Sequence, residues 1–413
     1  MLSPVTTLTK GQIIEHDLEK YVDLSIQWSR WLLKPYGMWP NLSDTTRIDK
    51  YFSWILIVIC SIIMSFFCVP CTLYIFLDAE DVYDKITHVG PLAFCVVAYI
   101  KFYAVIARGD DIRECIECIE WDWFNIKYSE DRNIMIAKAN YGKRISKICA
   151  LFMYSGAAFY YIVLPIKVGK IEIEGENTTF IPIAMPFPRQ ILDTRYSPIN
   201  EIIFVIQVLG GFLMHAVSAG VCSLIATFAL HICGQMEILS SWLEHLVDGR
   251  SDMCKTVDDR IGSIVNQHVR IIKCLSLIEK TMSRISLIEV AGRTLDMCLV
   301  GYHVIMEWHS KSMTATVTYT IIFTSVLFNI FIFCYVGELV GEQCAMIGET
   351  SYMIEWHRLP ERKQHSMILL IAMSNATSKL TAGSVIMLSL DSFSSVVKTA
   401  FAFLNMLRTV AVA

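Results

Sequence analysis

Three charged residues stand close together in an otherwise apolar stretch and are the first candidates for chemistry in this chain. Glu289 and Arg293 are four residues apart, and Arg293 and Asp296 are three apart, so a helix places all three on one face. Ions of opposite sign on one face can neutralise each other, whereas a lone ion facing lipid is costly. We therefore predict that the segment 285–306 crosses a membrane with its charged face towards the protein interior.

The segment 381–408 also combines membrane length with charge, in particular Asp391 and Lys398. Such charges normally face water or another subunit, which indicates a pore or an interface. Together with Ser394 and Ser395, these two residues form a polar face that suits either contact between subunits or the lining of a wide vestibule. Alternatively, Asp391 and Lys398 simply pair with charged groups of other helices or extend towards the membrane surface. Helical spacing places one further, mainly apolar set near a single stripe that suits a conduit: Ala402, Met406, Thr409 and Val410.

Composition points to a membrane protein. The chain has 413 residues, of which 54% are hydrophobic and 18% charged, and its mean hydropathy is +0.48. This is too apolar for an ordinary soluble domain and too long for one span. The net charge of −4 and the lack of a long basic run give no sign of nucleic-acid binding.

The sequence contains no signature of an enzyme. We find no Gly-x-Ser-x-Gly, no His-Glu-x-x-His, no phosphate-binding loop and no dinucleotide fingerprint. The histidines His215, His231, His303 and His309 are scattered along apolar segments, where they usually bond to a neighbouring helix. The 14 cysteines include two Cys-x-x-Cys pairs without a well-spaced partner pair, so we expect neither a metal site nor a cofactor.

Hydropathy predicts an all-α, polytopic fold with seven transmembrane helices. Lys and Arg are concentrated between the second and third spans and between the fourth and fifth, which places these loops in the cytoplasm. The acidic segment near Asn177, a glycosylation acceptor in Asn-Thr-Thr, suits the outside, so the N-terminus is expected inside and the C-terminus outside. The predicted spans are 51–77, 86–107, 145–166, 202–236, 285–306, 312–337 and 380–407.

The chain divides into six predicted regions. In the segment 236–284, apolar residues recur at intervals of three and four residues, which indicates two amphipathic helices separated by a break at 249–252. Pro360 ends one element before the last span, so the final helix is expected in two halves. The regions are a cytoplasmic amphipathic segment (1–50), helices one to four (51–235), a cytoplasmic hairpin (236–284), helices five and six (285–337), a cytoplasmic extension with the first half of helix seven (338–379), and its pore-lining second half (380–408).

Several motifs resemble the insect odorant receptors over most of the chain. They are Leu-Thr-Ala-Gly at 380–383, Leu-Ser-Leu at 388–390, VVKTAFAFLNMLR at 396–408, IEWHRLP at 354–360, the segment 328–337, and Trp121-Asp122-Trp123. The resemblance implies a ligand-gated, non-selective cation channel in the plasma membrane of olfactory neurons, with the cytoplasmic helices as the subunit anchor. It also implies that Met406 and Val410 form the gate and that Thr409 is a polar pore residue. Arg408 departs from this pattern, because it brings positive charge to the outer end of a cation pathway.

The resemblance further implies a pocket for a small volatile or lipid-like odorant between the outer halves of helices two to six. The segment 236–284 lacks the long insertion of the shared co-receptor, so we expect an odorant-binding subunit that forms a heterotetramer with that co-receptor. A gustatory-type channel, a metabotropic receptor and a transporter are the alternatives, and plain helix packing is the alternative for each pocket residue. The candidate pocket residues are His88, Leu92, Phe94, Cys95, Phe159, Tyr160, Val163, Ile203, Ile206, Phe212, Thr316, Thr320 and Phe323.

Overall fold

The computed structural model describes residues 10–40, 46–79, 82–172, 179–251, 253–254, 256–376 and 379–412, and the glycosylation candidate Asn177 lies outside them. The described chain is helical apart from two small hairpins, the non-helical segment 181–198 and shorter connections. Its helices are α1 (Lys10–Leu33), α2 (Arg47–Leu77), α3 (Val82–Ala107), α4 (Gly109–Asn125), α5 (Ser129–Ala158), α6 (Leu164–Val168), α7 (Ile199–Glu244), α8 (Val257–Ser310), α9 (Met313–Met353), α10 (Glu361–Ala376) and α11 (Leu390–Val412). A π-helical turn (Phe159–Val163) joins α5 to α6, and 3-10 turns occupy Lys34–Tyr36 and Trp356–Arg358. The hairpin strands are β1 (Ile171–Glu172) with β2 (Thr179–Phe180), and β3 (Thr381–Ala382) with β4 (Ile386–Met387).

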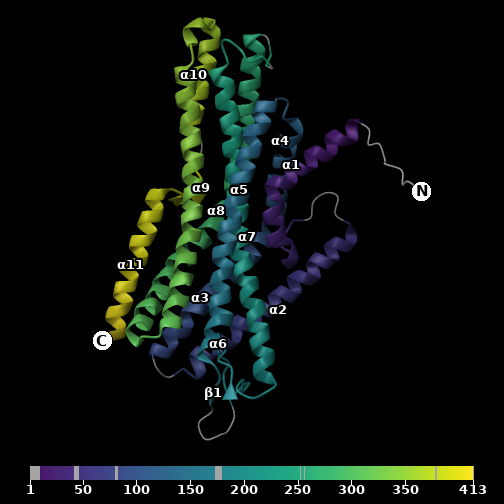
Figure 1. Ribbon diagram of the computed structural model, residues 1–413. Helices are drawn as coiled ribbons and strands as arrows, with labels where there is room; N and C mark the ends of the chain where they lie inside the picture. Colours follow the sequence, from purple (N-terminus) through teal and green to yellow (C-terminus); the bar gives the residue numbers. More distant parts are fainter. Residues whose placement is uncertain are drawn as a thin grey trace, which may run out of the picture.

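Helix α7 is the centre of the molecule. Every residue from Leu213 to Met236 is buried, because α1, α2, α3, α5, α8 and α9 all pack against this helix. The absence of formal charge between residues 202 and 236 permits this burial on every side. In Figure 1, α5, α7, α8 and α9 run along the long axis, α10 lies at one end, and α11 stands at the side of the bundle.

The fold is that of an all-α polytopic membrane protein, as predicted. Among the described residues, five helices are long and apolar enough to cross a bilayer: Arg47–Leu77, Asp84–Ala107, Ser129–Val168, Ile199–Glu244 and Met313–Met353. Helices α8 and α11, which contain the fifth and seventh predicted spans, fall outside this group because both carry ions. Both nevertheless pack along the same bundle, α8 against α3 and α9, and α11 against α8 and α9.

The last predicted span has a different form from the one expected. Residues 380–389 are not helical, and the final helix begins only at Leu390. The hairpin β3–β4 turns at Gly383 and Ser384, which both have positive φ values, of 66° and 59°. A helix cannot contain two such residues, which corrects the predicted helical region 380–408 at its start.

The first span also begins earlier than predicted, within the region 1–50. Thr46 and Asp49 form a reciprocal capping box that starts α2 at Arg47. The amphipathic helix α1 does not stand free, because Ser29 Oγ lies 2.8 Å from Ser223 Oγ of α7. The N-terminal helix is therefore part of the bundle.

Helices α7 and α8 form a hairpin at the end of the bundle that carries α10 (Figure 1). The Arg260 guanidinium donates hydrogen bonds of 2.8 Å to three carbonyl oxygens of the connection, those of Leu246, Val247 and Cys254. Gly249 has a φ of 79° and its missing side chain leaves room for the guanidinium, since a Cβ there would lie 2.7 Å from Arg260 Nη1. These contacts hold the connection in one conformation.

Candidate functional site

A cavity lies where five helical elements meet. Its volume is about 50 Å³, enough for a few water molecules. The walls come from α3, the π-helical turn, α7, α8 and α9, which correspond to predicted spans two to six. Its lining residues are Gly90, Pro91, Phe94, Tyr160, Tyr161, His215, Asp296, Val300, His303, Tyr319, Ile322 and Val326.

Aromatic rings form most of the cavity wall. The His303 ring stacks on Tyr319 at a centroid distance of 4.9 Å, and Phe94 lies 4.5 Å from His215. His215 Nδ1 bonds to the Gly211 carbonyl oxygen of its own helix at 2.8 Å. An aromatic wall with few polar groups suits a small, largely apolar ligand, and the walls must move apart to admit one, because the present volume of about 50 Å³ holds only a few water molecules.

The structure brings few of the predicted pocket residues to this cavity. Tyr160 and Phe94 line it, whereas Thr320 is exposed and His88 pairs with Asp84 at 3.3 Å. Phe212 stacks on Tyr154 at 6.1 Å. The remaining predicted residues are buried or half-buried in helix contacts and are not among the lining residues: Leu92, Cys95, Phe159, Val163, Ile203, Ile206, Thr316 and Phe323.

The cavity is bordered by the same helices that the sequence analysis selected, but mostly by other turns of each helix. His215 and His303 were assigned to helix packing and Asp296 to an ion cluster, yet all three line the cavity. The choice of turn depends on the tilt of each helix and on the π-helical turn, which shifts the faces of α5 and α6 relative to each other. Neither follows from spacing along the chain.

A fully buried ionic network lies beside the cavity. Arg293 Nε donates to Glu289 Oε1 at 2.8 Å, and Arg293 Nη1 lies 2.8 Å from Asp296 Oδ2, as the spacing of these residues predicted. Lys101 of α3 completes the network, with its Nζ 2.7 Å from Glu289 Oε2 and 2.7 Å from Ser218 Oγ of α7. The two positive and two negative side chains sum to zero.

Lys101 was missed as a member of this network, although the sequence contained a signal. The charges of Glu289, Arg293 and Asp296 sum to −1, so a buried helix carrying them needs one more cation. Lys101 is the one formal charge in the predicted second span, 86–107. Pairing the single positive charge of span two with the net negative charge of span five would have placed these two spans side by side.

Below this network, α8 holds the hairpin that precedes α11. Thr381 donates its backbone N–H to Glu279 Oε2 at 2.9 Å, and its hydroxyl also bonds to that carboxylate. The Gly383 N–H donates to the Ser283 carbonyl oxygen at 2.8 Å. The Leu-Thr-Ala-Gly motif thus attaches the chain to α8 immediately before the final helix.

Helix α9 holds the start of α11 from the other side. The Leu390 N–H donates to Glu338 Oε2 at 3.0 Å, so a carboxylate caps this helix. Gly337 permits the close approach, because a Cβ there would lie 2.3 Å from the Leu388 carbonyl oxygen. The position of α11 is therefore set by both α8 and α9.

Helix α11 contacts the bundle along a narrow line and leaves the rest of its surface open. Val396, Ala400 and Leu404, four residues apart, are buried. The stripe residues with described side chains are exposed: Ala402, Met406 and Thr409; Val410 lies on the helix, and its side chain is outside the description. The polar face is exposed too, and at about 100° per residue it lies on the same side of the helix as this stripe. The polar face and the stripe are therefore one continuous surface of α11, made by Asp391, Ser394, Ser395 and Lys398 together with the stripe residues.

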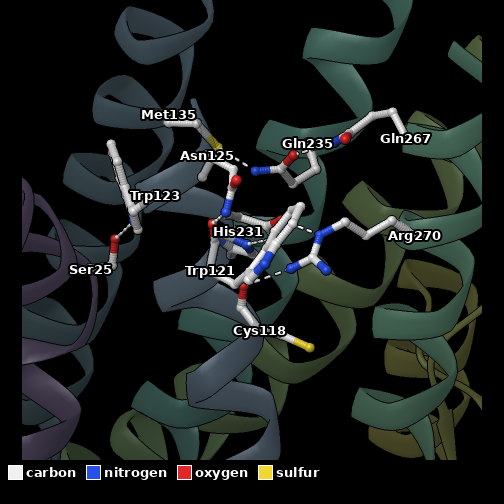
Figure 2. A network of polar contacts seen from close by, with 11 residues as sticks. Ser25, Cys118, Trp121, Trp123, Asn125, Met135, His231, Gln235, Gln267 and Arg270 are labelled. Carbon is white, nitrogen blue, oxygen red and sulfur yellow. Dashed lines mark hydrogen bonds and ion pairs between the residues drawn. The ribbon is translucent and has the colours of Figure 1, made fainter. Parts of the chain in front are cut away.

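The Trp121-Asp122-Trp123 motif organises a second polar network, between α4, α7 and α8 (Figure 2). Asp122 accepts hydrogen bonds from His231 Nε2 at 2.8 Å and from Arg270 Nε at 2.5 Å. The Arg270 guanidinium lies 3.5 Å from the centroid of the Trp121 ring. Trp123 is buried and donates to Ser25 Oγ at 3.0 Å, which connects α1 to the network.

Comparison with known proteins places this architecture in one family. The family model for the 7tm Odorant receptor matches residues 81–401. Odorant receptor 82a of Drosophila melanogaster is 22% identical over 61% of this chain and 64% of its own length, so the chain spans just under two thirds of that relative. Odorant receptor 22c of the same fly is 20% identical over 77% of this chain and 79% of its own length, and odorant receptor 10 of Aedes albopictus is 23% identical over 71% and 76%.

Solved structures agree on the fold. Olfactory receptor OR5 of Machilis hrabei in complex with eugenol covers 96% of this chain and 99% of its own, with a TM-score of 0.75 and 14% identity. A second structure of olfactory receptor OR5 of Machilis hrabei gives a TM-score of 0.73 at 15% identity over 94% of this chain and 99% of its own. The family match and the long apolar helices define a multi-pass receptor of the membrane rather than an enzyme. The chain belongs to the insect odorant receptor family, as its motifs predicted.

Proposed function

We propose that this chain is the odorant-binding subunit of a ligand-gated, non-selective cation channel. The supporting observation is a continuous connection from the cavity to the final helix. Val300 and Asp296 of α8 line the cavity, and Glu279 and Ser283 of the same helix bind the hairpin before α11. A ligand that shifts α8 would therefore move the start of α11.

The gate is proposed to lie on the exposed side of α11. Met406 is 63% exposed in the single chain, which is unfavourable for a large apolar side chain unless lipid or another subunit covers it. Several such helices around one axis would close a pore with Met406 and Val410 by dewetting, with Thr409 as a polar lining group. A small outward movement of the helices would then let cations pass.

The proposed assembly is a heterotetramer with the odorant receptor co-receptor in the plasma membrane. The helices α7, α8, α9 and α10 meet at one end of the bundle, which we propose to be the cytoplasmic anchor for subunit contact (Figure 1). The connection between α7 and α8 is short, from Glu244 to Val257, which favours an odorant-binding subunit over the co-receptor. The energy for opening comes only from tighter binding of the ligand to the open state.

The test is to record currents from cells that express this chain with the co-receptor while a panel of volatiles is applied. A rapid current that persists when G proteins are blocked supports the channel, and a delayed, blocker-sensitive response contradicts it. Val300→Phe narrows the cavity, and we expect it to raise the half-maximal ligand concentration about tenfold, the usual scale for filling part of an apolar pocket. Leu295→Phe is the matched control, because Leu295 lies on the same helix and is 46% exposed; equal effects of the two variants would refute the assigned pocket.

A further inference from the structure

We propose that the cavity selects neutral ligands that donate a hydrogen bond, such as an alcohol or a phenol with a small apolar body, through Asp296 and His303. This proposal rests on the proposed function, because it assigns a ligand class to the same cavity. The two residues face the cavity from α8 and are each 2% exposed. Asp296 Oδ1 and His303 Nε2 are acceptor atoms without a hydrogen-bond partner among the described residues.

Asp296 carries the stronger acceptor. Neither of its carboxylate oxygens makes a hydrogen bond within the described part of the chain. Arg293 Nη1 is close to Oδ2, at 2.8 Å, but it is not aligned as a donor and is itself without a hydrogen-bond partner there. A buried carboxylate oxygen without a donor is costly, so a ligand hydroxyl that reaches it gains a strong, charge-assisted bond.

His303 presents a second acceptor. Its ring stacks on Tyr319, and its Nε2 has no hydrogen-bond partner among the described residues. In the neutral ring, a donating Nδ1–H leaves Nε2 as an acceptor. Nε2 faces Gly90 of the cavity wall, since a Cβ built on that glycine would lie 3.6 Å from it.

The two acceptor side chains lie in the wall of the same cavity, so one ligand can reach either of them. Asp296 and His303 are seven residues apart, which is about two helical turns, so both lie on the same side of α8 about 10 Å apart. Between them lies Val300, and opposite them lie Tyr160 and Ile322, which supply apolar contact. A ligand with one hydroxyl would use the charged acceptor and place its apolar body against these side chains.

The charge balance of the neighbouring network argues for a neutral ligand. Lys101, Glu289, Arg293 and Asp296 sum to zero and are all 0–2% exposed. An ammonium group bound at Asp296 would leave one unbalanced positive charge inside the membrane, and a carboxylate would face Asp296 directly. Both are costly in a region that excludes water.

Binding can be tested separately from conduction. The full chain in complex with its co-receptor is purified, and its thermal stability is measured against 2-phenylethanol, benzyl alcohol and 1-octanol, each beside its methyl ether, and against 2-phenylethylamine. We expect at least one alcohol to stabilise the protein at about tenfold lower concentration than its ether, and the amine to act no better than the ether. Equal action of alcohols and ethers, a stronger action of the amine, or no stabilisation by any alcohol overturns the proposal. Selective binding without current would instead refute only the channel function.

Three variants assign the preference to residues. Asp296→Asn is expected to reduce the preference for the alcohol over its ether to within about threefold, and Lys101→Met combined with it restores neutrality if the single variant fails to fold. His303→Phe keeps the ring against Tyr319 and removes the acceptor, so it should reduce the preference less. Val300→Ala is the control, because it removes apolar contact from both ligands and leaves their ratio unchanged. An unchanged preference in the folded Asp296 variants contradicts the role of the carboxylate.

Discussion

Replacing Lys101 by Met should destabilise the helix bundle strongly, because it removes one ion from a network that is neutral as a whole. Lys101 Nζ lies 2.7 Å from Glu289 Oε2, and both side chains are 0% exposed. Without Lys101, the remaining side chains of Glu289, Arg293 and Asp296 carry a net charge of −1. Breaking a buried pair in this way typically costs about 3–5 kcal/mol.

This cost is large compared with the stability of a typical domain, about 5–15 kcal/mol. We therefore expect Lys101→Met to lower the melting temperature of the solubilised protein sharply and to reduce its amount at the cell surface. The double variant Lys101→Met with Glu289→Gln is neutral again and should recover most of the loss, since replacing both partners of a buried pair is often tolerated. Fluorescence-detected size-exclusion after heating measures four proteins in the same detergent: the unchanged protein, Lys101→Met, Glu289→Gln and the double variant.

Lys398→Met is the matched control, because Lys398 is an exposed lysine on α11 and belongs to no buried network. Its melting temperature should equal that of the unchanged protein. If the double variant is as unstable as the sum of its two single variants, the coupling between Lys101 and Glu289 is absent and the reasoning is refuted.

Three further outcomes are expected. Gly337→Ala should destabilise the protein by about 1–3 kcal/mol through overpacking, because its Cβ would lie 2.3 Å from the Leu388 carbonyl oxygen. Gly341→Ala is the control, one turn further along the helix: its Cβ would meet nothing within 4 Å, so it should be neutral or stabilising. Equal shifts of the two melting temperatures would contradict this. Cys254 is the one exposed cysteine among those described, so an impermeant maleimide should label it only in permeabilised cells, and labelling of intact cells would reverse the proposed orientation. Asp122→Asn should cost about 1–3 kcal/mol by weakening two buried hydrogen bonds, whereas Asp110→Asn on the same helix, 92% exposed, should leave the melting temperature unchanged; equal melts would dismiss the second network.

The helices of this fold could be predicted from the sequence because the lipid imposes their length and polarity. The charge-free segments 51–77 and 202–236 lie within long helices, and 312–337 does so from Met313 onward. Even the ion-bearing segment 285–306, which lies in α8, was identified as helical from the spacing of its charges. The hairpin at Thr381–Met387 was not predicted, because its residues are apolar enough for a helix. Its form depends on contacts with Glu279 and Ser283, which lie about a hundred residues away in the chain.

The candidate site was predictable to the level of helices but not of side chains. Tyr160 was chosen for its aromatic ring and does line the cavity, whereas Thr320 was chosen for its hydroxyl and is exposed. Spacing along one helix defines its faces only relative to each other. The face that meets the cavity is set by neighbouring helices, as with Tyr161, which fits against α7 only because Gly211 has no side chain.

The neutrality of the ionic network has a consequence for the membrane potential. One elementary charge that crosses the full potential of 100 mV exchanges about 2.3 kcal/mol with the field. Lys101, Glu289, Arg293 and Asp296 move as a body whenever α3 and α8 move together, and their net charge is zero. The field therefore does almost no work on this network, so a joint movement of α3 and α8 is not opposed or driven by the membrane potential through these four ions.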